Sequence, residues 1–198
     1  MRAIKAFDSQ LCATQGKGIM QYELGKTYKE AEAKCAHNGF HCAENPLCAL
    51  GYYEGMSSRF FIVEAGGEIN QDGNGTRISC TEITLLKEIT RLQLAALACE
   101  YIQKYPDREE KETHLERNVG YVNREDDFII VRGKNPKAKG VKGSYIFLLK
   151  EKKGSREIEQ IQAAYIDDIE IKADQYYGLR GVAICAVSYT HLTLPTIA

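Results

Sequence analysis

Two histidines and three cysteines stand close together in the N-terminal part of the chain: Cys35, His37, His41, Cys42 and Cys48. These residue types bind zinc, which needs four nitrogen or sulfur ligands in a tetrahedron, usually from closely spaced cysteine pairs. No second cysteine pair stands at a matching distance, and adjacent His41 and Cys42 on a strand would point to opposite faces. We therefore expect no metal site, with the cysteines buried as small hydrophobic residues.

His41 also precedes two tyrosines and two glutamates, which are Tyr52, Tyr53, Glu64 and Glu68. A strand-borne histidine, a tyrosine and a glutamate around a short helix resemble ADP-ribosyltransferase folds, in which histidine and tyrosine hold the nicotinamide ribose and glutamate orients the nucleophile. The resemblance implies an NAD-dependent transferase with His41, Tyr52 and either Glu64 or Glu68 in its site. Because it rests on residue order and type alone, we favour an ordinary core strand with packed tyrosines.

The remaining catalytic motifs are incomplete. Gly25-Lys26-Thr27 lacks the upstream glycine of a phosphate-binding loop, and neither Gly-x-Ser-x-Gly nor His-Glu-x-x-His occurs. A cysteine with His41 as its base would lack a local acid or oxyanion feature. Four lysines between 134 and 142 are not interleaved with aromatic residues, so we expect a solvated turn rather than a nucleic-acid site. These observations favour a non-enzymatic binding or structural module without a cofactor.

Composition excludes several broad classes. Lys and Arg number 26 against 27 Asp and Glu, for a net charge of −1, which argues against nucleic-acid and membrane-surface partners. No apolar run approaches the length of a membrane span, and residues 1–8 have no signal-peptide core. Seven cysteines without regular spacing indicate reduced thiols. We expect a bacterial cytoplasmic or virion-associated protein whose partner is an unknown protein or a second copy.

Strands are predicted in the N-terminal half at residues 2–8, 19–24, 40–43, 59–65 and 77–83, with turn chemistry at 72–75. Asn45 followed by Pro46 predicts a capped helix from residue 46 to about 53. Leu85, Ile89 and Leu92 recur at helical spacing, which predicts one long helix over 84–104. A charged linker is expected at 106–118, and further strands are expected beyond it.

The predicted fold class is α+β: a mixed N-terminal domain with one long helix, followed by a small antiparallel C-terminal sheet. The expected boundaries are 1–105 for the first domain, 106–118 for the linker and 119–186 for the β-rich part. Residues 187–198 resemble translated sequencing adapter found at the ends of unrelated metagenomic proteins. We therefore expect this tail to be artefactual and the natural C-terminus to be absent.

Several phrases together resemble an uncharacterised domain family common in phages and prophages of gut bacteria. They are Ala3-Ile4-Lys5-Ala6-Phe7-Asp8, Gln21-Tyr22-Glu23-Leu24-Gly25, Asn38-Gly39-Phe40-His41, Glu44-Asn45-Pro46-Leu47 and, near the C-terminus, Ile171-Lys172-Ala173-Asp174-Gln175-Tyr176-Tyr177. The resemblance covers most of residues 2–181 and implies a phage accessory protein without an assigned activity. Longer relatives insert short repeats that suggest a stacked β-solenoid, of which this chain keeps only Gly133 to Gly143 as a terminal rung.

Overall fold

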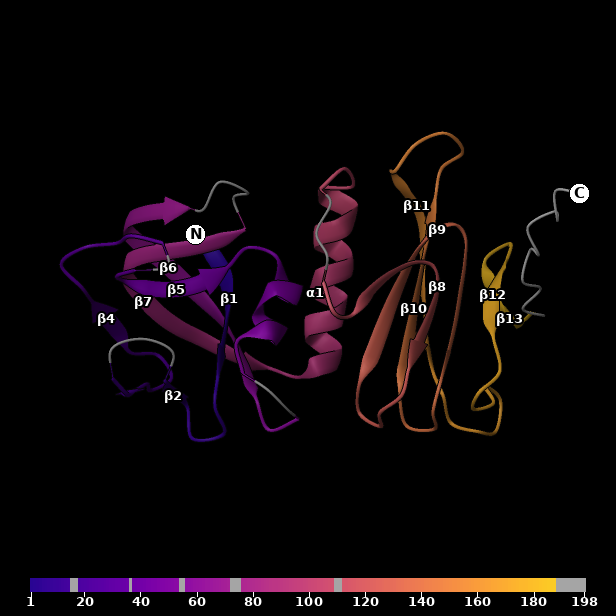
Figure 1. Cartoon of the computed structure of the whole chain (residues 1–198), viewed down its shortest axis with the longest axis horizontal. Helices are drawn as coiled ribbons and strands as arrows, with labels where there is room; N and C mark the ends of the chain where they lie inside the picture. The colour runs from indigo at the N-terminus through magenta and orange to yellow at the C-terminus, as the bar shows by residue number, and fades with distance from the viewer. Residues whose placement is uncertain (15–17, 36, 54–55, 72–75, 109–111, 188–198) are drawn as a thin grey trace, which may run out of the picture. The chain divides into compact units, whose positions relative to one another are not determined.

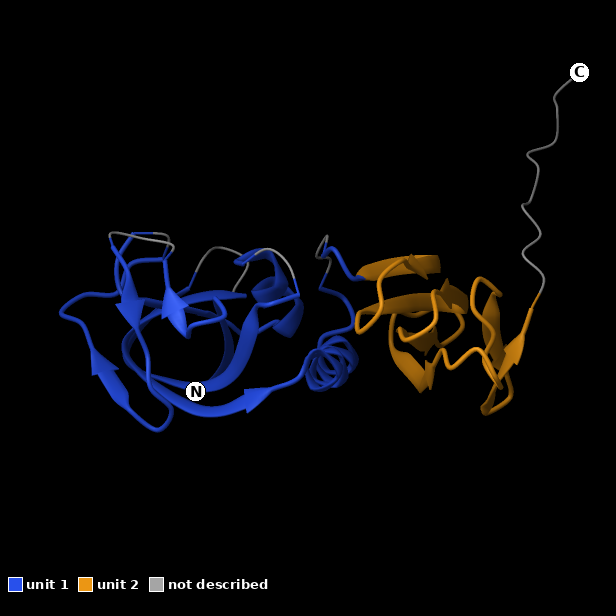
Figure 2. Ribbon diagram, turned by 90° about the horizontal axis from the view of Figure 1, so that it is seen from below, with its two compact units in different colours: residues 1–114 blue, residues 115–198 orange. Residues whose placement is uncertain are grey.

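The structure is a computed structural model that describes residues 1–14, 18–35, 37–53, 56–71, 76–108 and 112–187. The described residues are mostly β, with 51% of them in strands and 11% in helices, and these strands form three sheets. The predicted α+β class with one long helix is therefore wrong. The chain divides into two compact units, residues 1–114 and 115–198, which are coloured blue and orange in Figure 2 and are described separately.

Within its described residues, the first unit contains seven strands and two helical segments, and Figure 1 shows how they are arranged. Its elements are β1 (Arg2–Phe7), β2 (Cys12–Ala13), β3 (Met20–Gln21), β4 (Thr27–Lys29), β5 (Phe40–Ala43), the 3₁₀ helix η1 (Pro46–Gly51), β6 (Arg59–Gln71), β7 (Arg77–Ile89) and α1 (Arg91–Lys104). The predicted cap of the short helix is confirmed, because the Asn45 side chain accepts a hydrogen bond from the Leu47 amide and Pro46 begins the helix. The predicted turn at 72–75 lies outside the described residues.

The strands of the first unit form a small barrel. β6 pairs with both β1 and β7, β7 pairs with β5, and β5 pairs with β1, all antiparallel, so the hydrogen-bonded path closes on itself. β4 pairs with β7 beyond the end of β5. Irregularities in the register of β6 against β7 lie between Ile62 and Val63 and between Gly66 and Ile69, and bulges of this kind bend strands. Closure therefore leaves little unpaired edge in the ring.

The long predicted helix begins seven residues later than expected, because residues 84–89 belong to strand β7. Val63 and Glu64 of β6 pair with Leu85 and Thr84, and this pairing overrides the local helical pattern. Thr90 then starts α1 with a capping box, in which its side chain accepts from the Gln93 amide while the Gln93 side chain accepts from the Thr90 amide. The helix is therefore short and lies outside the barrel sheet.

Strand β1 and residues 60–63 of β6 are largely buried on both faces, which explains the hydrophobic sequence of that part of β6. Phe7 and Phe61 point into the barrel interior, where their ring centroids lie 5.5 Å apart in an edge-to-face arrangement. Ile4 and Phe60 point the other way and pack with Leu94 of α1. Alternation along β1 consequently places Ala3, Lys5 and Phe7 on the interior side.

The second unit is a six-stranded sheet. Its strands are β8 (Leu115–Val122), β9 (Phe128–Gly140), β10 (Tyr145–Glu151), β11 (Ile158–Tyr165), β12 (Tyr177–Arg180) and β13 (Ala183–Ala186). The predicted antiparallel C-terminal sheet is wrong, because β9 pairs in parallel with both β8 and β10. Residues 134–140, predicted as part of a solvated turn, belong to β9.

In this unit, short links join neighbouring strands that pair in parallel, an arrangement that resembles stacked coils of chain. Leu115 stands beside Ile130 and Phe128 stands beside Tyr145, while the turns also stack, since the Tyr145 amide donates to the Asp127 carbonyl over 2.9 Å. Gly133 has φ 154°, and a Cβ there would lie 2.4 Å from Asn118 Oδ1, so the close approach of β8 and β9 requires glycine. The solenoid character thus begins at β8, earlier than the predicted terminal rung.

Within the described part of the chain, no helix is both long and apolar enough to cross a membrane. Of residues 187–198, which the sequence predicted to be an artefactual tail, only Val187 is described, and residues 109–111 of the expected linker also lie outside the described residues.

Candidate functional site

Lys5 is a charged residue at an interior position of the barrel in the first unit. Lys5 is 9% exposed. Its sequence neighbours Ile4 and Ala6 point away from the barrel interior and pack in the cluster that contains Leu94 of α1. Lysine is seldom buried without a partner of opposite charge, because removing an ammonium group from water is costly. Its burial here therefore needs a structural explanation.

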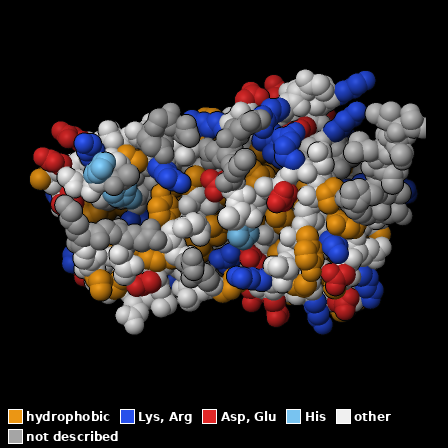
Figure 3. All heavy atoms as spheres, viewed as in Figure 1, with side chains coloured by type: hydrophobic (Ala, Val, Ile, Leu, Met, Phe, Trp, Pro, Cys, Tyr) orange, Lys and Arg blue, Asp and Glu red, His pale blue; other side chains and the backbone are white. Residues whose placement is uncertain are grey.

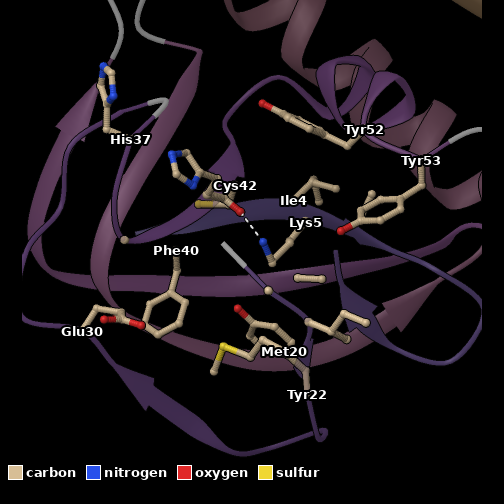
Figure 4. Close-up of a pocket in the computed structure, with 16 residues that line it drawn as sticks. Ile4, Lys5, Met20, Tyr22, Glu30, His37, Phe40, Cys42, Tyr52 and Tyr53 are labelled. Carbon is tan, nitrogen blue, oxygen red and sulfur yellow. Dashed lines mark hydrogen bonds between the residues drawn. The ribbon is translucent and has the colours of Figure 1, made fainter. Parts of the chain in front are cut away.

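The Lys5 ammonium has one direct hydrogen bond, which Nζ donates to the His41 carbonyl oxygen over 2.7 Å (dashed in Figure 4). Nζ also lies 5.4 Å from the ring centroid of Phe7 and 5.7 Å from that of Tyr22. Among the described residues, no carboxylate forms an ion pair with it. Burial lowers the pKa of Lys5 from 10.5 to about 8, against a smaller opposing effect of Cys42 and Cys80.

A cavity of about 430 Å³ opens onto Lys5. Its wall includes Met20, Phe40, Tyr52, Tyr53, His37 and Glu30. Figure 4 shows Tyr52 and Tyr53 reaching over the cavity from the end of η1 while Tyr22 and Met20 lie on the opposite side of Lys5. On the face displayed in Figure 3, histidine and hydrophobic side chains lie next to each other at the surface of this unit. A hollow whose wall combines aromatic and apolar side chains with several polar groups is a candidate small-molecule site.

His41 lies on β5 and lines this cavity together with Tyr52 and Tyr53. Burial lowers the pKa of the His41 imidazole, and the nearby Lys5 charge lowers it further. The Tyr53 hydroxyl oxygen accepts a hydrogen bond from the Thr14 amide over 3.0 Å. The structure therefore brings together the histidine and the tyrosine that the sequence suggested as site residues.

The two suggested glutamates do not line the cavity. Glu64 and Glu68 are exposed on β6, where Glu64 stands opposite Arg2 and the Glu68 amide donates to Thr81 Oγ1 over 2.9 Å. Glu30, which directly follows β4, is the glutamate at the cavity. A transferase that used this cavity would accordingly take its carboxylate from Glu30.

The cysteines that stand close together in the sequence lie in different environments in the structure. Cys42 is buried in the barrel interior beside Cys80, and its hydrogen bond with Cys80 together with burial raises the pKa of the Cys42 thiol. Cys48 Sγ donates to Glu112 Oε1 over 3.0 Å, and Cys35 Sγ donates to the Arg77 carbonyl over 3.7 Å. In the part of the chain that the structure describes, no three metal-binding side chains are grouped to hold an ion.

Sequence reasoning missed Lys5, Tyr22 and Glu30 as members of one site. The available signal was the position of Lys5 between Ala3 and Phe7 on the same face of a strand whose two neighbours, Ile4 and Ala6, are also apolar. A lysine in such a strand is expected to be at least partly enclosed whichever face it takes. No comparable sequence pattern marks Tyr22 and Glu30. They belong to separate segments of the chain, which the folding of the barrel brings to the cavity.

Comparison with known proteins identifies a matching family whose function is not described. Residues 1–97 match the model of a family described as Domain of unknown function (DUF7666). No curated protein and no solved structure matches the chain. The matched segment contains β1 to β7 and all the cavity residues named above. The N-terminal part is therefore similar to an uncharacterised domain family, as the sequence predicted.

Proposed function

We propose that this chain is a non-enzymatic binding module whose first unit holds a small aromatic acid in the Lys5 cavity. One observation carries the proposal: the buried Lys5 ammonium faces a cavity and forms no ion pair with a carboxylate of the described residues. A ligand anion would supply the missing opposite charge, and a charge-assisted hydrogen bond in a poorly hydrated site is stronger than one at a surface.

The cavity wall also defines the body of the ligand. Phe40, Tyr52 and Tyr53 present aromatic surface, and Met20 adds a flexible thioether that adapts to irregular shapes. A planar aromatic ring is favoured by such a wall because offset and edge-to-face ring contacts add to the burial of apolar area. A volume of about 430 Å³ fits a small molecule and suits one ring with short substituents.

The biological setting belongs to the same proposal. The sequence phrases that resemble a phage and prophage family support an accessory role during infection or lysogeny, in the bacterial cytoplasm or on a virion. An unknown protein or a second copy of this chain remains the proposed macromolecular partner. The near balance of charge, −1 overall, supports a partner other than nucleic acid.

The alternative is an NAD-dependent transferase of the ADP-ribosyl type. It is favoured by one observation, the presence of His41 and Tyr52 on the wall of one cavity. Its carboxylate would be Glu30 rather than Glu64 or Glu68. The alternative requires NAD to enter the cavity and requires a covalent product, whereas the binding module requires neither.

The test is calorimetric titration of the full chain with 4-hydroxyphenylacetate, with the corresponding neutral amide, and with NAD. The proposal expects the acid to bind and the amide to bind at least tenfold more weakly, because only the acid pairs with Lys5. Lys5→Met should abolish this preference, whereas Lys87→Met, at an exposed position of β7, should retain it. Equal binding of acid and amide would contradict the proposal, and binding of NAD with release of nicotinamide would establish the alternative.

A further inference from the structure

The position of the Lys5 amine suits a nucleophile as well as a charged partner for an anion. A neutral lysine amine carries two N–H bonds and one lone pair. One N–H bond is held by the His41 carbonyl oxygen, which Nζ approaches to 2.7 Å. This hydrogen bond directs the lone pair away from that oxygen, and the cavity opens at Lys5. The nitrogen is therefore both oriented and accessible to a molecule in the cavity.

The surroundings make the neutral form of the Lys5 amine more populated than that of an exposed lysine. Aromatic rings of Phe7 and Tyr22 enclose the nitrogen, and the described residues provide no carboxylate that would hold the proton on it. Desolvation of a lysine in an apolar pocket is one of the established ways in which proteins activate this amine toward carbonyl carbon. The lowered pKa of Lys5, about 8, agrees with this expectation.

We propose that Lys5 captures small aromatic aldehydes by forming a reversible imine inside this cavity. The proposal rests on the proposed function, since it assigns a second ligand class to the same binding site. The Nζ lone pair attacks the aldehyde carbon and gives a carbinolamine. Loss of its hydroxyl group as water then leaves a C=N bond, so one aldehyde and one amine yield one imine and one water. No oxidant or reductant takes part.

Tyr53 is placed to assist the loss of water. Its hydroxyl oxygen already accepts a hydrogen bond from the Thr14 amide over 3.0 Å, so its own proton is directed elsewhere. Figure 4 shows Tyr53 beside Lys5, with its hydroxyl group directed toward the Lys5 side chain. A proton donor at that place can protonate the departing hydroxyl group, which is the usual role of a general acid. Tyr53 is thus a candidate proton donor for the carbinolamine.

The experiment incubates the full chain with 4-hydroxybenzaldehyde and sodium cyanoborohydride at pH 8, followed by mass spectrometry of tryptic peptides. Reduction converts the imine into a stable secondary amine and blocks cleavage after Lys5. The labelled peptide should then begin at Ala3 and continue past Lys5, whereas a label on the amino terminus would lie on the Met1-Arg2 fragment. Lys5 should be labelled at least tenfold faster than any exposed lysine, and Tyr53→Phe should slow this labelling.

Controls separate this inference from the proposed function. Excess 4-hydroxyphenylacetate should protect Lys5, Lys5→Met should remove the specific label, and Lys87→Met should retain it. If the acid binds but Lys5 is labelled no faster than exposed lysines, the inference is overturned and the proposed function stands. If Lys5 is labelled selectively but the acid does not bind, the inference stands and the proposed function is overturned. Labelling of the wild-type chain decides the question even where a variant fails to fold.

Discussion

The Nζ atom of Lys5 lies 2.7 Å from the carbonyl oxygen of His41, so a side chain of β1 tethers β5 from inside the barrel. The same hydrogen bond connects two residues that line the cavity, one through its ammonium group and the other through its backbone. β1 and β5 are otherwise paired in register at Ile4 and Ala43. Under the proposed function, the charge of Lys5 would therefore couple the stability of the barrel to ligand binding.

The free energy of unfolding should depend on pH through Lys5. Because the pKa is about 8 in the folded state and 10.5 in its ordinary state, the unfolded chain binds more protons between these values. The stability of the wild type relative to Lys5→Met should consequently rise by about 3 kcal/mol from pH 8 to pH 10.5. Below pH 8 the difference should be constant. Urea unfolding of both chains across this range measures it, and parallel curves would show that Lys5 is not buried as described.

Binding of an aromatic acid should take up protons above pH 8. The bound anion favours the protonated form of Lys5 and so raises its pKa, which means that the complex holds a proton that the free protein has partly lost. Affinity should fall about tenfold for each pH unit above 8, until the pKa of the complex is reached. Titrations in two buffers of different ionisation enthalpy measure the uptake directly. An affinity that does not change between pH 7 and pH 10 would contradict the pairing.

The best-predicted strands are those that can be identified from the residue types within the strand itself. Residues 59–65 lie within β6, where β-branched and aromatic residues dominate, and residues 77–83 lie within β7, where apolar and polar residues largely alternate. The boundary of α1 was misplaced because Leu85 and Ile89 satisfy the helical period and also lie on the buried face of β7. The missed signal was the capping box at Thr90 and Gln93, which marks a helix start at Arg91.

The candidate site was predictable only in part. His41 and Tyr52 belong to neighbouring elements, so their order in the sequence was sufficient to group them. Glu30 and Tyr22 line the same cavity as Lys5 because the barrel closes, and closure depends on long-range pairing that no local pattern reports. The parallel pairing of β8 with β9 was missed for the same reason, since parallel strands joined by short links have no hairpin turn to mark them.

Gly39 should be essential for the position of β5. It has φ 86°, and a Cβ would lie 2.6 Å from Ser79 Oγ and 2.9 Å from the Cys80 carbonyl oxygen. Gly25 is a matched control with φ 78°, where a Cβ would meet no atom within 4 Å. Gly25→Ala should cost about 1 kcal/mol for its backbone conformation alone, whereas Gly39→Ala should cost about 3 kcal/mol because crowding is added. Thermal unfolding compares them, and equal losses would mean that the contact at Gly39 relaxes without cost.

In the second unit, Glu151 should be the most sensitive carboxylate. It is 6% exposed, and its two oxygens accept from Arg132 Nε over 2.7 Å and from Arg117 Nη2 over 2.9 Å. Arg132 is 2% exposed, and burial lowers the pKa of its guanidinium group, so the loss of the Glu151 carboxylate would remove an opposite charge from a buried cation.

Glu151→Gln is therefore expected to destabilise the chain by about 3 kcal/mol, because an amide is a weaker partner for two guanidinium groups. Glu157 provides the control: it pairs with Lys152 over 2.6 Å, but both side chains are exposed, so solvent screens the interaction. Glu157→Gln should leave the urea midpoint unchanged. Hydrogen exchange of the β9 and β10 amides should report the loss in Glu151→Gln locally, since Arg132 and Glu151 lie on these two strands. If both variants shift the midpoint equally, burial of the Arg132–Glu151 pair does not determine its contribution.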